Sequence, residues 1–540
     1  MSAAGLDKAS RAAGIDKTGR AAGELPSEIK NTPIRRRVTD LDHAGGDTGA
    51  MQVFASLRDA NVVLDGPVGC HVMPAVAVIN YTDSLPYLQN VTCSELSETE
   101  VTLAGTLGVL KEKVAAAAAD GKQVFIVSTP VSELIGATWT TEHIHEKGSA
   151  LFFDSHSLDD DEWRARDRAL LFLWAHRDHF IERGTSTPPR TSTRPLVNIV
   201  GPTYGNFNSY SDLAEIKRLI AGIGAEVNLV FPFESSAHDT ARLADAAATV
   251  VMYREYGSSL AHEVGLPTFF APIGLEPTTR FLRDLGAVLG LEADVAAFIA
   301  REKTETLAAW HDIWRSTHSD FFANAPVAIV APPTYKDGLT YYLGEELGLP
   351  VAFSAYRTGP QSAPSDEVRD ALRGLSPAPM LVLGSINERM ILAQEALPSR
   401  FLQCSFPGAV VRRATGTPFV GYAGALWLLQ CVCETLFDVL FANLPTSAAP
   451  PERASVPTKD LLRDAPGVAA ANGKGQNSIT TWTDEAKALA ELTVKRVPFF
   501  VRVSVNKKLR AEAEKLAGQR GCDVDEAIVR EVTARYAPRN

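Results

Sequence analysis

A cysteine lies in a glycine-rich turn early in the chain. The turn reads DGPVGCH at Asp65–His71 and follows the apolar run Asn61–Leu64, which we expect to be a buried strand. Glycines beside a thiol let a bulky ligand approach the backbone, and their amides can donate hydrogen bonds to inorganic sulfide. A tight turn around a small buried thiol explains the local pattern equally well.

An iron–sulfur cluster usually needs four thiolates. Cys70 has at most Cys93 near it in the sequence, so this chain cannot complete a cubane cluster unaided. Either there is no cluster, or the site is shared with a partner subunit. The sequence therefore favours a protein that depends on a partner.

Polar side chains follow other predicted strands. Parallel sheets bind ligands at loops after the carboxyl ends of their strands, so these residues are candidates for binding or catalysis. The candidates are Tyr204, Asn206 and Asn208 after Leu196–Val200, Arg254 and Glu255 after Thr249–Tyr253, and Asn387 and Glu388 after Met380–Leu383. For the adjacent charges Arg254 and Glu255, a structural ion pair is the alternative.

Several common motifs are absent from the sequence. It contains no G-x-x-x-x-G-K-[ST], so we do not expect the chain to bind ATP through a P-loop. It has no G-x-G-x-x-G opening a helix, no H-E-x-x-H and no paired C-x-x-C. His143 and His145 could ligate a metal, but without a carboxylate or thiol framework they are more typical of surface histidines.

Net charge, apolar runs and cysteine content narrow the functional class of the protein further. The net charge of −11 argues against a general nucleic-acid binder. The sequence contains no run of 18 apolar residues, so we expect no transmembrane helix. Six cysteines in 540 residues are typical of reduced thiols. We expect a cytoplasmic protein.

Short β-branched runs alternate with amphipathic helices, which predicts α/β domains with parallel sheets. One such helix is expected to begin with Ser211 as its N-cap. The expected parts are a weakly ordered extension (1–38), three α/β domains (39–195, 196–325 and 326–450), a linker (451–481) and a small helical domain (482–540).

Longer stretches resemble the nitrogenase component-1 superfamily, and within it the Z-type subunits of chlorophyllide a reductases. They include VVLDGPVGCHVMPAVAVINYTD at Val62–Asp83, VSTPVSELIGA at Val127–Ala137, NIVGPTYGNFNSYSDLAEIKRLIAGIGAEVN, VVMYREYG, APIGLEPTTRFLRDLG, GSINERMILA and SFPGAVVRRATGTPFVGYAGA. The resemblance covers roughly residues 38 to 445. The tail from Trp482 to Ala517 resembles the C-terminal domain of the B-type subunits of light-independent protochlorophyllide reductases.

The resemblance implies three Rossmann-like domains and a heterotetramer with a homologous, Y-type subunit. A separate, X-type iron–sulfur ATPase would hydrolyse ATP and deliver electrons. A 4Fe–4S cluster at the subunit interface would pass them to chlorophyllide a and reduce its C7=C8 bond. Cys70 matches the position of one cluster ligand, with three more from the partner. Cys93 is not expected to be a ligand, and Pro130 stands at a third nitrogenase cysteine position.

The same resemblance implies roles for the polar residues. Tyr204, Asn206, Asn208 and Arg412 are expected to bind the tetrapyrrole, with Arg413 beside Arg412. Arg254, Glu255 and Glu388 are weak catalytic candidates that could bind a propionate or relay a proton. Two alternatives stay open. One is a B-type subunit that reduces the C17=C18 bond of protochlorophyllide, which Cys70 in place of that subunit's Asp opposes. The other is a scaffold that assembles a metallocluster.

Overall fold

The computed structural model describes residues 44–72, 74, 89–137, 139, 150–183, 192–316, 322–359, 361–406, 416–443, 482–495 and 502–534. The chain divides into two units, Met1–Leu444 and Pro445–Asn540, which we describe separately. The predicted extension (1–38) and linker (451–481) lie outside the described residues, as do His143 and His145.

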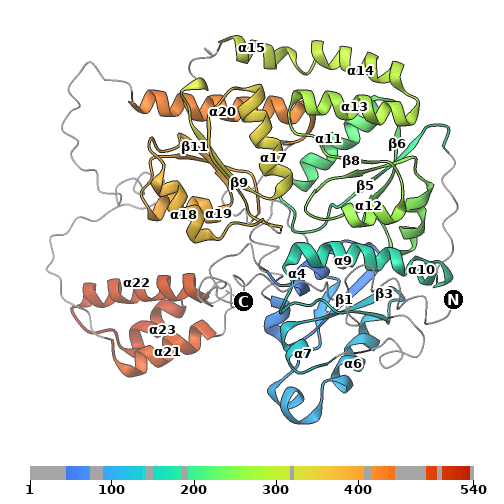
Figure 1. Ribbon diagram of the computed structural model, residues 1–540. Helices are drawn as coiled ribbons and strands as arrows, with labels where there is room; N and C mark the ends of the chain where they lie inside the picture. The colour runs from blue at the N-terminus through green and yellow to red at the C-terminus, as the bar shows by residue number, and fades with distance from the viewer. Residues whose placement is uncertain are drawn as a thin grey trace. The chain divides into compact units, whose positions relative to one another are not determined.

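The first unit contains three parallel four-stranded sheets with the same strand order (Figure 1). The first strand of each set lies inside its sheet, between the second and the third. The sheets are β2-β1-β3-β4 (Val91–Cys93, Ala60–Asp65, Gln123–Ser128, Ala150–Phe153), β6-β5-β7-β8 (Glu226–Phe231, Leu196–Val200, Ala248–Val251, Thr268–Phe270) and β10-β9-β11-β12 (Val351–Tyr356, Val327–Ala331, Leu381–Gly384, Arg400–Gln403). The predicted α/β fold class is confirmed.

Helices connect the strands and cover the sheets. Those of the first domain are α4 (Gly46–Ala55), α6 (Leu107–Ala117), α7 (Pro130–Leu134), α9 (Glu162–Ala175) and α10 (Arg177–Arg183). The second has α11 (Ser209–Gly222), α12 (Ser258–Val264), α13 (Leu275–Leu289), α14 (Glu292–Thr304) and α15 (Ala308–Ser316). The third has α17 (Pro333–Tyr341), α18 (Ser365–Gly374), α19 (Ile386–Gln394) and α20 (Gly421–Asn443).

Both faces of the first sheet are buried. In β3, Val124 and Ile126 pack with Leu110 and Val114 of α6, whereas the alternate residues Phe125 and Val127 join the main core with α4 and α9. Successive strand side chains point to opposite faces, so a strand covered on both sides reads as a continuous apolar run. This explains why the central strands are conspicuous in the sequence.

Helix α4 crosses α9 at very close range. A Cβ atom on Gly46 would lie 2.2 Å from the Ser155 carbonyl oxygen, and one on Gly49 would lie 2.0 Å from the Glu162 carbonyl oxygen. Only residues without a side chain allow this approach. Because α4 leads directly into β1, the crossing fixes the strand that carries the Cys70 turn.

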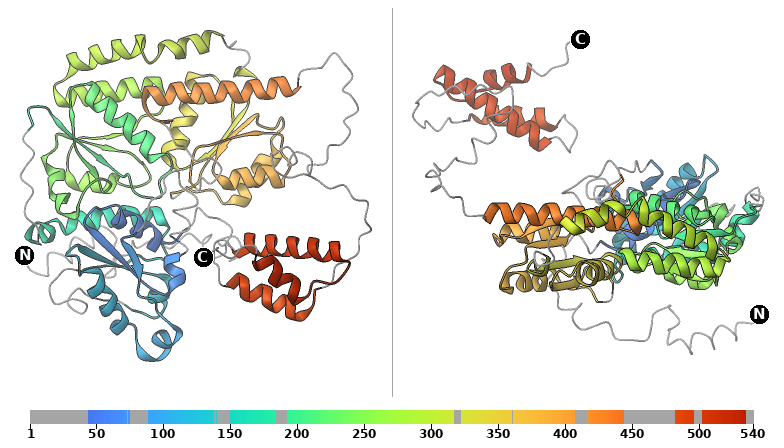
Figure 2. Two further views of the ribbon diagram at one scale, coloured as in Figure 1. Left: turned by 180° about the vertical axis from the view of Figure 1, so that it is seen from behind. Right: turned by 90° about the horizontal axis from the view of Figure 1, so that it is seen from above.

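The second and third domains contact each other through a long helix. Helix α20 packs against α11 and α13 of the second domain and against β12 of the third. Figure 2 shows this helix from behind and from above. Helix α11 begins at Ser209 with Asn208 as N-cap, so the predicted N-cap at Ser211 is wrong. The Ser211 hydroxyl instead accepts a hydrogen bond from the Thr417 amide, 3.2 Å away.

The second unit contains three described helices: α21 (Asp484–Lys495), α22 (Arg502–Arg520) and α23 (Glu526–Ala534). They enclose a separate small core of Ala486, Ala490, Leu509, Ala513, Ala517, Val524, Ile528, Val529 and Val532. Small alanines in this core allow close helix packing. These three helices therefore have a hydrophobic core of their own.

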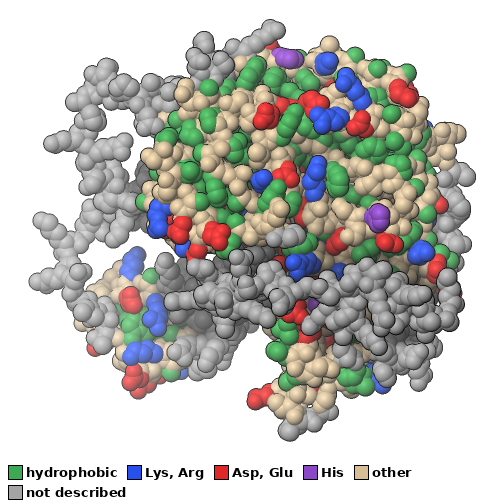
Figure 3. Space-filling model, viewed as in Figure 1, with side chains coloured by type: hydrophobic (Ala, Val, Ile, Leu, Met, Phe, Trp, Pro, Cys, Tyr) green, Lys and Arg blue, Asp and Glu red, His purple; other side chains and the backbone are tan. Residues whose placement is uncertain are grey.

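Acidic and basic side chains are interspersed over the face seen in Figure 3. Across the part of the chain that the structure describes, no helix is long and apolar enough to span a bilayer.

Candidate functional site

Cys70 lies just beyond the carboxyl end of β1. The chain turns sharply at Gly66, and the Cys70 amide donates to the Pro67 carbonyl over 2.9 Å. The thiol is half-buried. In this sheet the chain runs to opposite sides after β1 and β3, and such topological switch points form ligand-binding crevices in open α/β sheets. Cys70 therefore stands where the fold favours a ligand.

The loop after β3 forms the other wall of this crevice. Thr129 is fully buried there, and its hydroxyl donates to the Asp65 carbonyl over 2.8 Å. It lies close to Cys70, since a Cβ atom built on Gly66 would be 2.5 Å from the Thr129 hydroxyl oxygen and 3.2 Å from the Cys70 Cβ. Burial raises the pKa of the Cys70 thiol, and the Thr129 hydroxyl partly offsets this rise.

The Asp65 carboxylate anchors the start of the turn. Its oxygens accept hydrogen bonds from Ser94 and from the Trp139 indole, each over 3.0 Å. The carboxylate is fully buried, and burial raises its pKa. These bonds tie the end of β1 to loops that follow β2 and β3.

Four exposed apolar side chains lie on the segments that follow β1 and β3. Val68 and Val72 in the Cys70 turn are 53% and 39% exposed, and Leu134 and Ile135 after β3 are 72% and 39% exposed. We call these four residues the apolar rim. Exposed apolar groups gathered at one site are typical of protein–protein contacts.

Cys93 ends β2 and is 3% exposed. It pairs in register with Leu64 of β1, and burial raises the pKa of its thiol. Cys93 belongs to the sheet core, whereas Cys70 is partly open to solvent.

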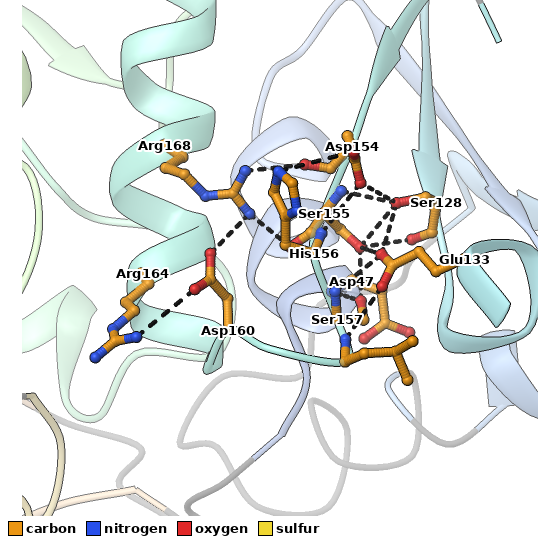
Figure 4. Close-up of polar contacts among 11 residues, drawn as sticks. Asp47, Ser128, Glu133, Asp154, Ser155, His156, Ser157, Asp160, Arg164 and Arg168 are labelled. Atoms are coloured by element: carbon orange, nitrogen blue, oxygen red, sulfur yellow. Dashed lines mark hydrogen bonds and ion pairs between the residues drawn. The ribbon is translucent and has the colours of Figure 1, made fainter. Parts of the chain in front are cut away.

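A polar network lies at the carboxyl ends of β3 and β4 (Figure 4). Glu133 accepts hydrogen bonds from Ser128, Ser155 and the Ser157 amide at 2.8–3.0 Å. Asp47 from α4 joins it, and desolvation raises the pKa of Asp47 to about 6. On the opposite side, Asp160 forms ion pairs with two arginines of α9, Arg164 and Arg168.

A second polar cluster lies where the three domains meet. Asn206 donates to the Tyr256 hydroxyl, and its carbonyl accepts from the Thr203 amide over 2.7 Å. Glu255 accepts from Thr334 of the third domain over 2.7 Å, and burial raises the pKa of Glu255. Asn206, Glu255 and Tyr256 line a cavity of about 40 Å³, together with Arg166 of the first domain.

This junction cavity is too small for a tetrapyrrole. A volume of about 40 Å³ holds only a few water molecules, whereas organic ligands occupy pockets of roughly 300–1,000 Å³. The Tyr253 hydroxyl is buried at the cavity without a protein partner. In this conformation, the cavity can bind water but not the predicted substrate.

Asn208 lies in a clamp between the second and third domains. Its amide donates to Asp212 over 3.0 Å and to the Thr417 carbonyl over 2.9 Å. Asp212 also accepts from the Tyr335 hydroxyl and from the Phe419 amide. Desolvation raises the pKa of Asp212 to about 7.

Tyr204 does not line the junction cavity. It lines a wide groove of about 730 Å³, with Phe233 on the same side and Arg58, Asn61 and Lys122 among the other lining residues. Asn61 lies near the amino end of β1, and Cys70 follows the carboxyl end. The groove and the Cys70 crevice therefore lie at opposite ends of the first sheet.

The charged candidate residues also lie in different surroundings. Arg254 is exposed and stacks over Phe270, with its guanidinium carbon 4.6 Å from the ring centroid. Glu388 is fully buried, pairs with Arg357 and caps α19 together with Ser385. Arg412 and Arg413 lie outside the described residues.

Cys70 is partly exposed, whereas Cys93, Cys404, Cys431 and Cys433 are buried. A Cβ atom built on Gly69 would meet nothing within 4 Å, so the turn has open space at the residue before Cys70. Over the described ranges, no three His, Cys, Asp or Glu side chains are grouped to hold a metal ion. A cluster at Cys70 would thus need ligands from outside the described part of this chain.

The sequence interpretation did not identify Thr129, Trp139 or the apolar rim as parts of the site. The Thr-Pro pair at 129–130 after a buried strand was the available signal, because it marks the β3 switch-point loop.

Comparison with known proteins identifies the family. The chain is 26% identical over 532 residues to the B-type subunit of light-independent protochlorophyllide reductase from Chloroflexus aurantiacus, covering 88% of this chain and 94% of that one. The corresponding Halorhodospira halophila protein is 28% identical over 381 residues, covering 62% and 67%. A solved structure of nitrogenase Cp1 at pH 6.5 superimposes with a TM-score of 0.60 at 16% identity, over 75% of this chain and 94% of that one, which shows a shared fold. The model of the nitrogenase component 1 type oxidoreductases matches residues 47–437, and the chain belongs to that family.

Proposed function

We propose that this chain is a subunit of the catalytic component of a chlorophyllide a reductase, in which ATP-dependent electron transfer reduces the C7=C8 bond of chlorophyllide a. The observation that carries the proposal is the half-buried Cys70 thiol at a switch point, inside the apolar rim. Family membership supports an oxidoreductase.

Cys70 would hold a 4Fe–4S cluster as its single ligand from this chain, and a homologous subunit would supply three more. Such a cluster supplies one-electron transfer when bound. Gly66 and Gly69 keep the backbone close to the thiol, and Asp65 anchors the turn. Cys93 stays in the core and is not assigned as a ligand.

The apolar rim supports a homologous partner subunit in a heterotetramer. Val68, Val72, Leu134 and Ile135 would become buried when that subunit covers the Cys70 crevice. The sequence has no P-loop, so ATP would be hydrolysed by a separate iron–sulfur ATPase that donates the electrons. We assign the reaction to the cytoplasm.

We propose that the substrate binds outside the three-domain junction, with residues of the partner completing its pocket. The volume of the junction cavity supports this arrangement. Asn206, Asn208 and Glu388 are then structural, since each is engaged in buried hydrogen bonds. Tyr204, Arg254 and Arg412 remain candidates for contact with substrate or partner, whereas Glu255 lies in the junction cavity and is bonded to Thr334.

The second candidate is a B-type subunit of a protochlorophyllide reductase. The names of the relatives that span most of the chain favour it. A cluster-assembly scaffold is the third candidate, because a shared cluster site is also compatible with that role.

An anaerobic turnover assay separates the three candidates. The chain is co-purified with its cognate partner and ATPase, and chlorophyllide a and protochlorophyllide are offered separately with ATP and reductant. A red-shifted bacteriochlorin band from chlorophyllide a is the expected result. Reduction of protochlorophyllide alone would establish the second candidate. No turnover of either substrate by a complex with an intact cluster would favour the scaffold.

Two cysteine variants test the ligand assignment. Cys70→Ser is expected to change or abolish the cluster signal in electron paramagnetic resonance, and Cys93→Ser is expected to keep it. The opposite pattern would refute the assignment.

A further inference from the structure

We propose that the groove at the amino end of the first sheet is a second ligand site, which binds a planar aromatic molecule carrying one carboxylate. The groove has a volume of about 730 Å³ and lies between the first and second domains. Organic ligands occupy pockets of roughly 300–1,000 Å³, and such pockets occur preferentially at domain interfaces. The site is separate from the Cys70 crevice and does not depend on the proposed reaction.

Each domain contributes one wall of the groove. The first domain contributes the ends of α4 and α6 and the start of β2. The second domain contributes Tyr204 from the loop after β5 and Phe233 from the loop after β6. These two strands are neighbours in the second sheet, and parallel sheets bind ligands at loops after the carboxyl ends of their strands. The apolar lining residues of the first domain are Ala55, Leu57, Val91, Ala116, Ala117 and Ala119.

Hydrogen bonds between the two domains hold the walls in place. The Tyr204 amide donates to the Ser56 hydroxyl over 2.9 Å. The Arg58 amide donates to the Ser235 carbonyl, also over 2.9 Å. Because both bonds cross the domain boundary beside the groove, a ligand meets walls that are already positioned. Binding to a preformed site costs less conformational entropy than binding that must order the protein.

Aromatic rings form the wall from the second domain. The rings of Tyr204 and Phe233 meet edge to face, with their centroids 5.6 Å apart. Phe233 also meets Tyr210 edge to face, at 5.4 Å. Tyr204 and Phe233 are both partly exposed, so their rings are accessible from the groove. A planar aromatic molecule can stack on such rings or meet their edges.

One positive charge in the groove is available to a ligand. Lys122 pairs with Asp120 over 2.9 Å, and both line the groove. Glu234, another lining residue, pairs with Lys217 over 2.6 Å. Within the described ranges, the exposed guanidinium of Arg58 makes no ion pair or hydrogen bond. A guanidinium binds a carboxylate through two parallel hydrogen bonds, so the groove offers one charged anchor beside an aromatic wall.

The groove lies too far from Cys70 for its ligand to touch a group bound there. Strand β1 leads from the groove to the Cys70 turn, and its six residues span about 20 Å. A ligand in the groove would contact the first and second domains together and stabilise them by its binding free energy. It would therefore act as an effector, and Tyr204 would contact this effector and not the reduced substrate.

The first test measures probe binding to the full-length chain by fluorescence anisotropy. The probes are pyrenebutyrate and its uncharged analogue pyrenebutanol. Pyrenebutyrate should bind saturably, and pyrenebutanol should bind about tenfold more weakly because it cannot pair with Arg58. Arg58→Gln should weaken the binding of pyrenebutyrate by the same factor. Arg194→Gln is the matched control, since Arg194 is exposed and precedes β5, at the opposite end of the second sheet from the groove.

Equal affinities for the two probes, or equal effects of the two arginine variants, would overturn the proposed carboxylate site. Because these measurements need neither a cluster nor turnover, their failure is distinct from a failure of the proposed function.

The second test locates the probe. Ala116→Trp fills the groove and should abolish pyrenebutyrate binding, whereas Ala115→Trp should keep it, since Ala115 is exposed on the same helix but does not line the groove. Bound pyrenebutyrate should slow hydrogen–deuterium exchange in the loops after β5 and β6. Equal binding in both tryptophan variants, or protection confined to the Cys70 turn, would overturn the assignment. Displacement of the probe by the partner subunit would show that a protein covers the groove, which would also overturn it.

Discussion

The ion pair between Glu388 and Arg357 gives a prediction that separates a structural role from a catalytic one. Both side chains are fully buried. Glu388 accepts from the Arg357 guanidinium, from the Ser385 hydroxyl at 2.8 Å and from the Ser385 amide at 2.7 Å. It therefore joins the end of β10 to the start of α19.

Glu388→Ala leaves the Arg357 charge buried without its carboxylate. Removing one partner of a buried pair costs roughly 3–5 kcal/mol, and loss of the cap accounts for about 1 kcal/mol of that. Replacing the pair by apolar residues of similar size is close to neutral, so Arg357→Met combined with Glu388→Leu should recover most of the loss.

The assay is hydrogen–deuterium exchange of peptides from β9, β10 and β11, together with thermal unfolding. Exchange reports the third sheet by itself, which matters because a chain of several domains need not unfold in one step. Glu276→Ala is the matched control. Its pair with Arg280 is solvent-exposed, so its loss should leave the stability of the chain nearly unchanged. If Glu388→Ala kept wild-type protection in the third sheet but lost turnover, the structural interpretation would be refuted.

Two further predictions concern the buried carboxyl of Asp212 and the close packing at Gly49. Burial raises the pKa of Asp212 from 3.8 to about 7, so the folded chain binds its proton more tightly, and stability should fall by about 3 kcal/mol as the pH rises from 4 to 7. Asp212→Asn should remove this pH dependence of stability. Unfolding of the wild type and of the variant, compared between pH 4 and pH 7, would detect the change. Parallel stability profiles of the two proteins would contradict the prediction. Gly49→Ala should destabilise the first domain by at least about 1–3 kcal/mol, because its Cβ would lie 2.0 Å from the Glu162 carbonyl. Gly108→Ala in α6 is the control, because a Cβ there would meet nothing within 4 Å, and it should leave the thermal stability unchanged or raise it. Equal losses of stability in the Gly49 and Gly108 variants would exclude the packing argument.

The strands show how far the sequence can be read. The apolar run at Leu196–Val200 is a strand with those same limits, and the run at Asn61–Leu64 lies inside strand β1. The sequence interpretation missed β2, β4, β8 and β12, all of which are edge strands of three or four residues. A strand this short has no measurable periodicity, and its conformation depends on pairing with a neighbour that the sequence does not reveal.

The polar candidates show where the sequence is insufficient. Their positions after strands were predicted correctly, since the carboxyl ends of buried strands are marked by Gly, Pro and polar residues. Their directions were not predictable, because each loop can face its own sheet, another domain or solvent. Asn206 and Glu255 contact other domains at the junction, and Tyr204 lines a groove at the opposite end of the first sheet from Cys70.

The α/β class, the central strands and the Cys70 turn can be predicted from local patterns, because apolar runs and glycine turns are visible in the sequence. The residues around Cys70 are set by long-range packing. Thr129 reaches Cys70 because β1 and β3 pair in parallel, with Asp65 opposite Ser128. The apolar rim likewise forms from two loops that are more than sixty residues apart in sequence. Contacts of this kind depend on strand pairing and helix packing, which no local pattern specifies.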